Sequence, residues 1–281
     1  MTNDAFAAVL LAAFMNAVWN SAIKVGGDKI VVMALTTLFG SVASFLALPF
    51  IGASTATSWG LLALSIVLHT IYHFTLAFAY RHGDLGQVYP IARGAAPLLV
   101  TLAAATFLFE LPSILVITGI AFLSVGVLAF ALGPRTDGNG WQGTAYALAT
   151  SVMIASYTVI DGLGARNSAS ALQFGVLLTI GDGIATALIV LMWKGRSAFY
   201  GTDSKTLFVS SLAGIMQIGS YWIILWALAR TPLGAVSALR ESSVLFVTLI
   251  STFLLKERLG IQRIACASLV FFGIILVKIG H

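Results

Sequence analysis

The fold is decided by a kind of segment that recurs along the chain. Residues 86–109 read GQVYPIARGAAPLLVTLAAATFLF, a stretch in which Arg93 is the only charged residue. An α-helix of about 20 apolar residues crosses the hydrocarbon core of a bilayer. Backbone groups cannot stay unpaired in lipid, so a single segment that crosses does so as a helix. This stretch therefore predicts a transmembrane helix.

Nine further runs have the same character, and together they predict ten membrane helices. The connections between the runs are short and rich in turn residues, such as Gly133-Pro134, Gly162-Leu163-Gly164 and Thr231-Pro232. The first run lacks a basic segment before it, so we interpret it as a membrane helix and not as a signal peptide. The ten runs are residues 5–23, 30–51, 59–80, 86–109, 113–132, 141–160, 171–193, 206–228, 234–255 and 261–279.

The composition of the whole chain supports the same class. Of its 281 residues, 59% are apolar and 9% are charged, whereas charged residues make up about a quarter of a soluble domain. A single cysteine excludes a disulfide scaffold, and the high hydrophobicity excludes disorder. The basic residues are scattered singly, so the net charge of +5 does not predict a nucleic-acid partner.

The chain also repeats itself. Residues 234–255 read GAVSALRESSVLFVTLISTFLL, and they align with the first stretch so that Arg240 matches Arg93, Glu257 matches Glu110 and Gly273 matches Gly126. We expect two five-helix halves, residues 1–137 and 138–281. Five is odd, so the second half enters the membrane from the opposite side, which is an inverted repeat suited to alternating access. The alternative is that apolar helices resemble one another by composition.

Three features occur together: ten spans, the duplication, and a glutamate at the end of spans four and nine (FLFE at 107–110, LLKER at 254–258). With these features the chain resembles the EamA-type branch of the drug/metabolite transporter superfamily. The resemblance covers nearly the whole chain. It implies a multi-pass carrier of the bacterial inner membrane, usually an exporter of amino acids or other small metabolites. It also implies a central cavity lined mainly by spans 1, 3, 4, 6, 8 and 9.

Ionisable residues at membrane depth are costly, so each one has to face protein or water. In residues 59–80, His69, Tyr72, His73 and Tyr80 fall on one face of a helix. This polar stripe predicts a cavity wall, with hydrogen bonds between helices as the alternative. A free histidine titrates near neutral pH, which favours a proton role over a metal site.

Arg93 lies beside Pro90, Gly94 and Pro97, which predict a broken or bent helix. Breaks of this kind often mark the site or gate of a carrier. Arg93 and its counterpart Arg240 would suit a carboxylate or phosphate-like group. The alternative is internal pairing with carboxylates, for which the chain offers Asp161, Asp182 and Glu241.

We therefore expect a secondary transporter, an exporter of a small polar or zwitterionic, amino-acid-like metabolite. The alternatives are an importer of a small anionic metabolite such as a phosphonate, and an intramembrane enzyme. We expect neither cofactor nor metal, and a monomer or homodimer. Protons are the candidate coupling ion, with Glu241 or a histidine of residues 59–80 as the group that carries them. The expected substrate-binding residues are Asn20, His69, His73, Tyr89, Arg93, Tyr157, Tyr221 and Arg240.

The two indicators of sidedness disagree. One set of loops and span edges carries ten lysines and arginines and the other carries three, and the positive-inside rule then puts both termini outside. The family resemblance implies both termini in the cytoplasm.

Overall fold

The chain folds into an all-helical bundle. A computed structural model describes residues 2–25, 28–51, 58–83, 85–130, 140–255 and 261–280. Within these residues 89% lie in helices and none forms a strand, which confirms the expected all-helical class. Seven of the described helices or broken helices are long and apolar enough to cross a membrane. Ten crossings in two inverted halves stay a prediction.

Each predicted run corresponds to one helix or to a pair of helix pieces. Two short helices lie outside this scheme, η1 (Leu48–Phe50) after the second run and α9 (Ser197–Tyr200) between the seventh and eighth. The runs that form one continuous helix, apart from η1 at the end of the second, are α1 (Asn3–Val25), α2 (Lys29–Ala47), α3 (Trp59–His82), α6 (Ile114–Phe130), α7 (Gly140–Asn167), α8 (Ala171–Lys194), α10 (Ser204–Leu228) and α13 (Ile261–Ile279).

The fourth and ninth runs, which match each other in sequence, are each broken into two helices. The fourth splits into α4 (Leu85–Gly94) and α5 (Ala96–Phe107), with Pro97 in the first turn of α5. This confirms the break expected beside Arg93. The ninth splits into α11 (Leu233–Arg240) and α12 (Ser243–Leu255).

The second break has a different cause, because no proline lies within residues 233–255. The backbone there tightens into i→i−3 hydrogen bonds, from Glu241 N–H to Ala238 O at 3.0 Å and from Ser242 N–H to Leu239 O at 3.1 Å. The Ser242 hydroxyl also donates to Leu239 O, at 2.7 Å. A serine side chain that competes for backbone carbonyls weakens the regular helix, so it replaces proline at this break.

One predicted connection is wrong. Gly162-Leu163-Gly164 does not end the sixth span, because α7 continues to Asn167. A Cβ at Gly162 would lie 2.5 Å from the Leu233 side chain, and one at Gly164 would lie 2.2 Å from Phe174. These glycines permit close packing of helices. Three further predictions lie outside the described residues. They are the turn at Gly133-Pro134, the boundary between residues 137 and 138, and the match at Glu257.

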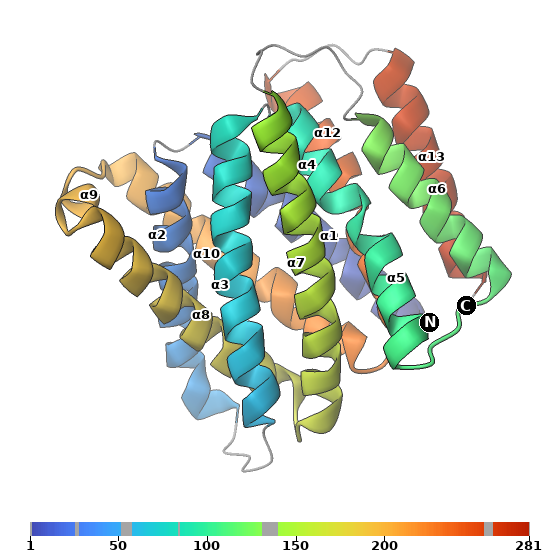
Figure 1. Ribbon diagram of the computed structural model, residues 1–281, viewed down its shortest axis with the longest axis horizontal. Coiled ribbons are helices and arrows are strands. Elements are labelled where there is room, and N and C mark those ends of the chain that lie inside the picture. Colours follow the sequence, from blue (N-terminus) through green and yellow to red (C-terminus); the bar gives the residue numbers. More distant parts are fainter. Residues whose placement is uncertain are drawn as a thin grey trace.

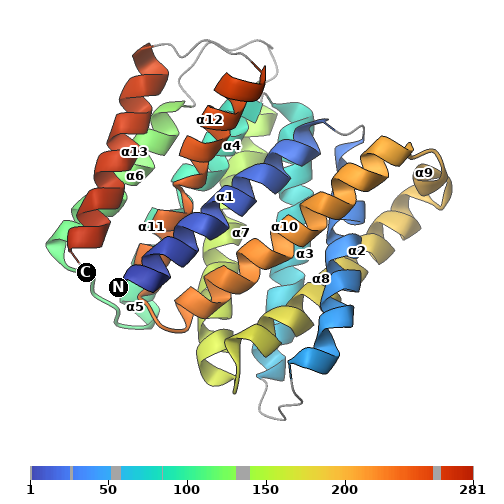
Figure 2. The same ribbon diagram turned by 180° about the vertical axis from the view of Figure 1, so that it is seen from behind.

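Close helix packing organises the bundle. In Figures 1 and 2, α6 and α13 lie side by side at one edge of the bundle. Their backbones approach at two glycines, where a Cβ on Gly119 would lie 2.9 Å from Gly273 O and a Cβ on Gly273 would lie 2.7 Å from Gly119 O. The main body forms by packing of α3 on α7, α2 on α8 and α1 on α10. Of the twelve largest fully buried side chains among the described residues, ten lie in these six helices.

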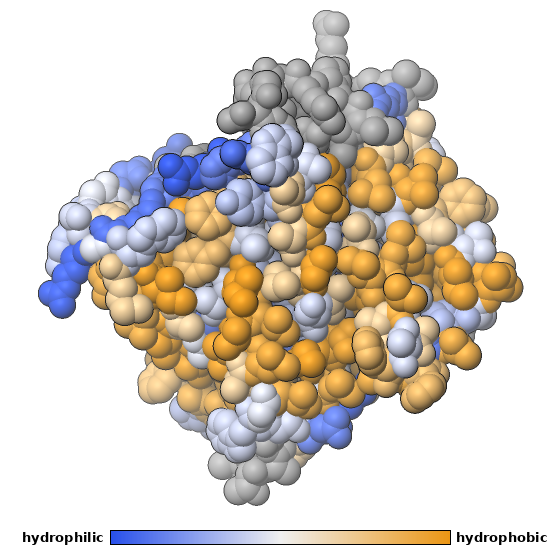
Figure 3. Space-filling view, in the orientation of Figure 1, coloured by the Kyte–Doolittle hydropathy of each residue, from blue (hydrophilic) through white to orange (hydrophobic). Residues whose placement is uncertain are grey.

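The outer surface has the apolar character of a membrane protein. Apolar residues cover the middle of the face in Figure 3, and hydrophilic residues gather toward its edges. Large side chains such as Phe45, Leu102 and Phe208 are exposed, as expected where lipid is the solvent. Both termini lie at the same end of the bundle (Figures 1 and 2), where Lys278 Nζ donates to Asn3 Oδ1 at 2.7 Å.

Candidate functional site

A narrow cavity of about 40 Å³ lies between the two halves of the chain. Both halves contribute polar and aromatic side chains to its wall. Helices α1, α2 and α3 come from the first half, and α7, α8, α10 and α11 come from the second. The lining residues that bear on the chemistry are Asn16, Trp19, His69, Tyr72, His73, Tyr157, Asp182, Gln217, Tyr221 and Arg240.

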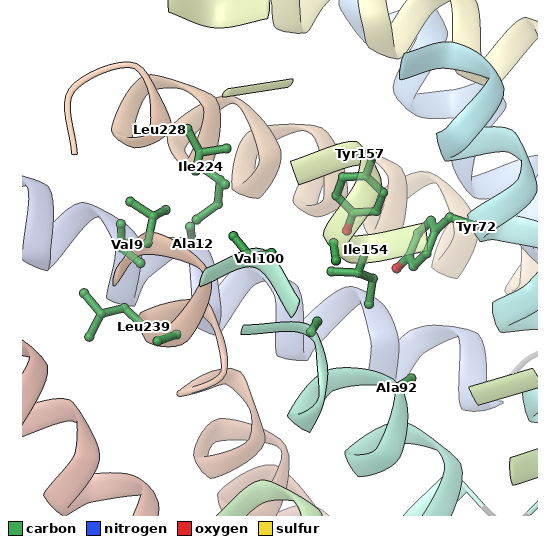
Figure 4. Packing of buried hydrophobic residues seen from close by; sticks show 14 of the residues in the cluster. Val9, Ala12, Tyr72, Ala92, Val100, Ile154, Tyr157, Ile224, Leu228 and Leu239 are labelled. Carbon is green, nitrogen blue, oxygen red and sulfur yellow. The ribbon is translucent and has the colours of Figure 1, made fainter. Parts of the chain in front are cut away.

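Aromatic residues form one wall of this cavity. The His69 and Tyr157 rings stack with their centroids 4.1 Å apart, and Tyr72 meets Tyr157 edge to face at 5.3 Å. Figure 4 shows Tyr72 and Tyr157 beside the apolar residue Ile154. Tyr157 is almost completely buried, so its hydroxyl is held in place by the surrounding core and can serve as a fixed polar group.

Arg240 is the cation of the cavity. Its Nη2 donates to the Tyr157 hydroxyl at 3.4 Å, and its guanidinium carbon lies 5.8 Å from the centre of the Tyr221 ring. The residue is 7% exposed and lies in the last turn of α11, at the break. Among the residues that the structure describes, Arg240 has no carboxylate within ion-pair distance. A buried arginine without a counter-ion is poised to bind an anionic group.

Arg93 has a different environment. Its Nε donates to Glu241 Oε2 at 3.0 Å, and both residues are buried. This ion pair joins the break between α4 and α5 to the break between α11 and α12. Arg93 Nη2 has no hydrogen-bond partner among the described residues. Glu241 therefore neutralises one of the two arginines, and internal pairing is realised for Arg93 only.

The two other buried carboxylates bind histidines. Asp161 lies inside α7, fully buried, and His69 Nε2 lies 2.9 Å from its Oδ2. The hydroxyls of Ser65 and Tyr221 also donate to Asp161. This network fixes the His69 ring on the cavity wall, and it leaves Asp161 unable to serve either arginine.

His73 forms the second pair. Its Nδ1 lies 3.2 Å from Asp182 Oδ1, and Gln217 Nε2 lies 3.2 Å from its Nε2. If the Gln217 amide donates here, His73 carries its proton on Nδ1 and is neutral. A second proton on Nε2 would require the Gln217 amide to turn its oxygen toward the ring. Among the described residues, no three His, Cys, Asp or Glu side chains gather as they would around a metal ion.

Helix α1 supplies amide groups. Asn16 Oδ1 accepts from Trp19 Nε1 at 3.0 Å, and Asn20 Nδ2 donates to Asn16 O at 2.9 Å. Tyr80 donates to Asn20 Oδ1 at 3.1 Å. Asn16 Nδ2 is buried and has no partner among the described residues, so an unpaired donor lines the same cavity as Arg240.

The predicted site residues divide into two groups. His69, His73, Tyr157, Tyr221 and Arg240 line the cavity. Asn20, Tyr89, Arg93 and Glu241 do not belong to its lining: Asn20 binds Tyr80, Arg93 binds Glu241, and Tyr89 lies 3.1 Å from the Ser243 hydroxyl. The cavity is also lined by Thr37 of α2 and by Leu178, Thr179 and Asp182 of α8. Neither of these helices belongs to the spans that were expected to line it. Asp182, a carboxylate within a predicted span, was the one sequence signal that could have indicated α8.

The Arg93–Glu241 pair supports a stability prediction. Arg93→Met leaves Glu241 buried and unpaired, which should lower the free energy of unfolding by about 3–5 kcal/mol. The double change Arg93→Met with Glu241→Leu removes both charges and should recover most of that loss. Thermal unfolding in detergent micelles measures both variants. Asp28→Asn, which breaks the exposed pair with Lys194, is the control and should cost about 1 kcal/mol or less. Equal destabilisation by the single and double changes would contradict the pairing.

Comparisons with known proteins agree with this architecture. Residues 141–279 match the model of the EamA-like transporter family. A solved structure, titled only as the crystal structure of a protein, is similar with a TM-score of 0.80 at 16% identity, over 99% of this chain and 98% of its own. At that identity the likeness shows a shared fold. None of the curated proteins matches the chain. Through its second half, the chain belongs to the EamA-like transporter family of the drug/metabolite transporter superfamily, a family of multi-pass membrane transporters.

Proposed function

We propose that this protein is a secondary transporter of the bacterial inner membrane that exports a small polar or zwitterionic, amino-acid-like metabolite by alternating access. The observation that carries the proposal is Arg240, a buried cation in a cavity between the two halves, with no carboxylate partner among the described residues. We propose export as the direction of transport because the family resemblance implies it.

The arrangement of the helices supports an inverted repeat. Traced along the chain, α1 starts at the end of the bundle where the termini lie, and α7 starts at the opposite end (Figures 1 and 2). The packing is also paired: α3 contacts α7 as α10 contacts α1, and α3 contacts α8 as α10 contacts α2. Two similar halves in opposite orientations offer two conformations of nearly equal energy, open to opposite sides.

The chemistry of the cavity supports the substrate class. Arg240 and the unpartnered amide of Asn16 are donors that suit a carboxylate or a similar anionic group. Asp182 and Gln217 lie on the same lining and suit an amino group or another hydrogen-bond donor. An anionic and a cationic group on one small solute would satisfy both.

Arg240→Gln should weaken binding of carboxylated solutes about ten-fold or more, the scale of a lost charge-assisted hydrogen bond. A thermal-shift screen with amino acids, phosphonates, polyamines and sugar phosphates identifies ligands, because a bound ligand stabilises the folded state. Each hit is then compared with its uncharged amide or ester and tested for transport in proteoliposomes.

The control for Arg240 is Arg230→Gln, which removes an exposed cation stacked on Trp226 and should leave binding unchanged. Equal affinity of Arg240→Gln and the native protein for carboxylated ligands would overturn the role of Arg240. Absence of transport of every hit by the native protein in proteoliposomes would overturn the transporter itself.

Coupling to protons is proposed for the His73–Asp182 pair. Both side chains line the cavity, whereas Glu241 is buried against Arg93 and lies outside the lining. A proton taken up by His73 would change the charge beside a bound solute. We therefore favour a span-three histidine over Glu241 as the coupling group.

His73→Gln should abolish the response of uptake to an imposed pH gradient while leaving exchange between equal pH values. His82→Gln, at the far end of α3 where His82 binds Phe78 O, is the matched control. Uptake in proteoliposomes is measured with and without the gradient. A native protein indifferent to the gradient, or a Glu241→Gln variant that alone loses the response, would refute this assignment.

A polar bridge supports closure of the cavity at the end where the termini lie. Glu110, which follows α5, accepts from Arg166 at the end of α7 and from the Leu233 N–H at the start of α11, the latter at 2.9 Å. Arg166 also donates to Leu228 O at 3.0 Å and to Thr231 O at 3.1 Å. Glu110 of the first half thus contacts two segments of the second half, and Arg166 extends the bridge to the end of α10. Opening at this end requires these contacts to break.

Glu110→Gln should raise access to the cavity from this end several-fold, because it removes the ion pair with Arg166. Access is measured as the labelling rate of Ser220→Cys, a lining position, in a Cys266→Ala background with a membrane-impermeant thiol reagent. Asp28→Asn, which breaks the pair with Lys194 at the other end, is the control. Unchanged labelling in Glu110→Gln, or an equal rise in the control, would contradict the closing role.

A further inference from the structure

A second cavity opens on the outer surface of the bundle. It lies between α1, α12 and α13, which are neighbours on the face seen in Figure 2. Its volume is about 450 Å³, and its walls are almost entirely apolar, with Leu10, Leu245, Phe246 and Ile275 among them. No residue of the proposed transport site lines it.

The packing of α13 explains why this groove exists. Gly119 and Gly273 draw α13 against α6, and α13 packs far more extensively there than against any other helix. Among the described residues, Phe271 and Ile279 on its other side remain exposed, together with Leu249 of α12. The groove is therefore a built recess in the surface that faces lipid.

One cation lies at the end of this groove. Lys278, in the last turn of α13, lies with its Nζ 5.1 Å from the centre of the Phe6 ring and donates to Asn3 Oδ1 at 2.7 Å. Within the described part of the chain, no carboxylate forms an ion pair with it. The aliphatic stem follows the apolar wall while the ammonium group stays at the level of the termini, as lysines do at a membrane interface.

We propose that this groove is a binding site for an anionic phospholipid, with an acyl chain along the apolar walls and the phosphate on Lys278. The two parts of the groove match the two parts of such a lipid. An apolar recess excludes a soluble polar ligand, and an ammonium group at its interfacial end selects a lipid with net negative charge over a zwitterionic one.

The groove also reaches the break between α11 and α12. Ser242, which belongs to the break between α11 and α12, is part of its lining. A bound acyl chain therefore contacts this break from the lipid side, while Arg240 contacts the cavity on the other.

Native mass spectrometry of the purified protein tests the site, with phosphatidylglycerol and phosphatidylcholine of equal chain length as probes. The native protein should retain phosphatidylglycerol about five-fold more strongly, the scale of one lysine near an anionic headgroup. Lys278→Gln should abolish this preference, and Lys278→Arg should keep it. Leu249→Trp, which fills the groove, should reduce retention of both lipids.

Arg230→Gln is the matched control, since it removes a cation exposed on α10 and should leave the preference intact. Equal retention of the two lipids by the native protein would overturn the proposal. So would an unchanged preference in Lys278→Gln, or an equal loss in Arg230→Gln. Lipid retention is measured without transport, so the result tests the lipid site independently of the proposed transporter function.

Discussion

Buried charge in an apolar bundle is the constraint on which the rest of this structure depends. Two buried arginines, Arg93 and Arg240, lie at the breaks of two helices, where an isolated ion in a low-dielectric interior is very costly. Glu241 compensates Arg93. The pair joins the two broken helices, one from each half, at their breaks.

The other carboxylates are distributed in a way that leaves Arg240 exposed to the cavity. Asp161 is occupied by His69, Ser65 and Tyr221, and Asp182 is occupied by His73. These assignments give the cavity one uncompensated cation and a separate histidine–carboxylate pair. Under the proposed function, this division lets Arg240 hold the solute while a separate histidine changes its charge.

Helix breaks in this protein arise by two physical routes. In the fourth span, proline removes backbone donors and glycine weakens the helix, and this break was predicted from Pro90, Gly94 and Pro97. In the ninth span, the Ser242 hydroxyl donates a local hydrogen bond to the Leu239 carbonyl. The amino-acid sequence around Ser242 does not distinguish this serine from the many serines that leave helices intact. Glycine shows the same ambiguity, because Gly162 and Gly164 suggested a turn and instead make room for Leu233 and Phe174.

The amino-acid sequence by itself determined the class of the protein, because the length and hydrophobicity of its segments leave no fold other than a bundle of membrane helices. It also indicated His69, His73, Tyr157, Tyr221 and Arg240, since polar side chains in apolar helices have to face one another or water. Only the tertiary structure decided which carboxylate serves which base, and it thereby separated Arg240 from Arg93, which the sequence alignment treats as equivalents. It also brought α2 and α8 to the cavity wall and left a groove beside α13. These outcomes depend on contacts between residues roughly 100 or more positions apart in the chain, and helical periodicity carries no information about such contacts.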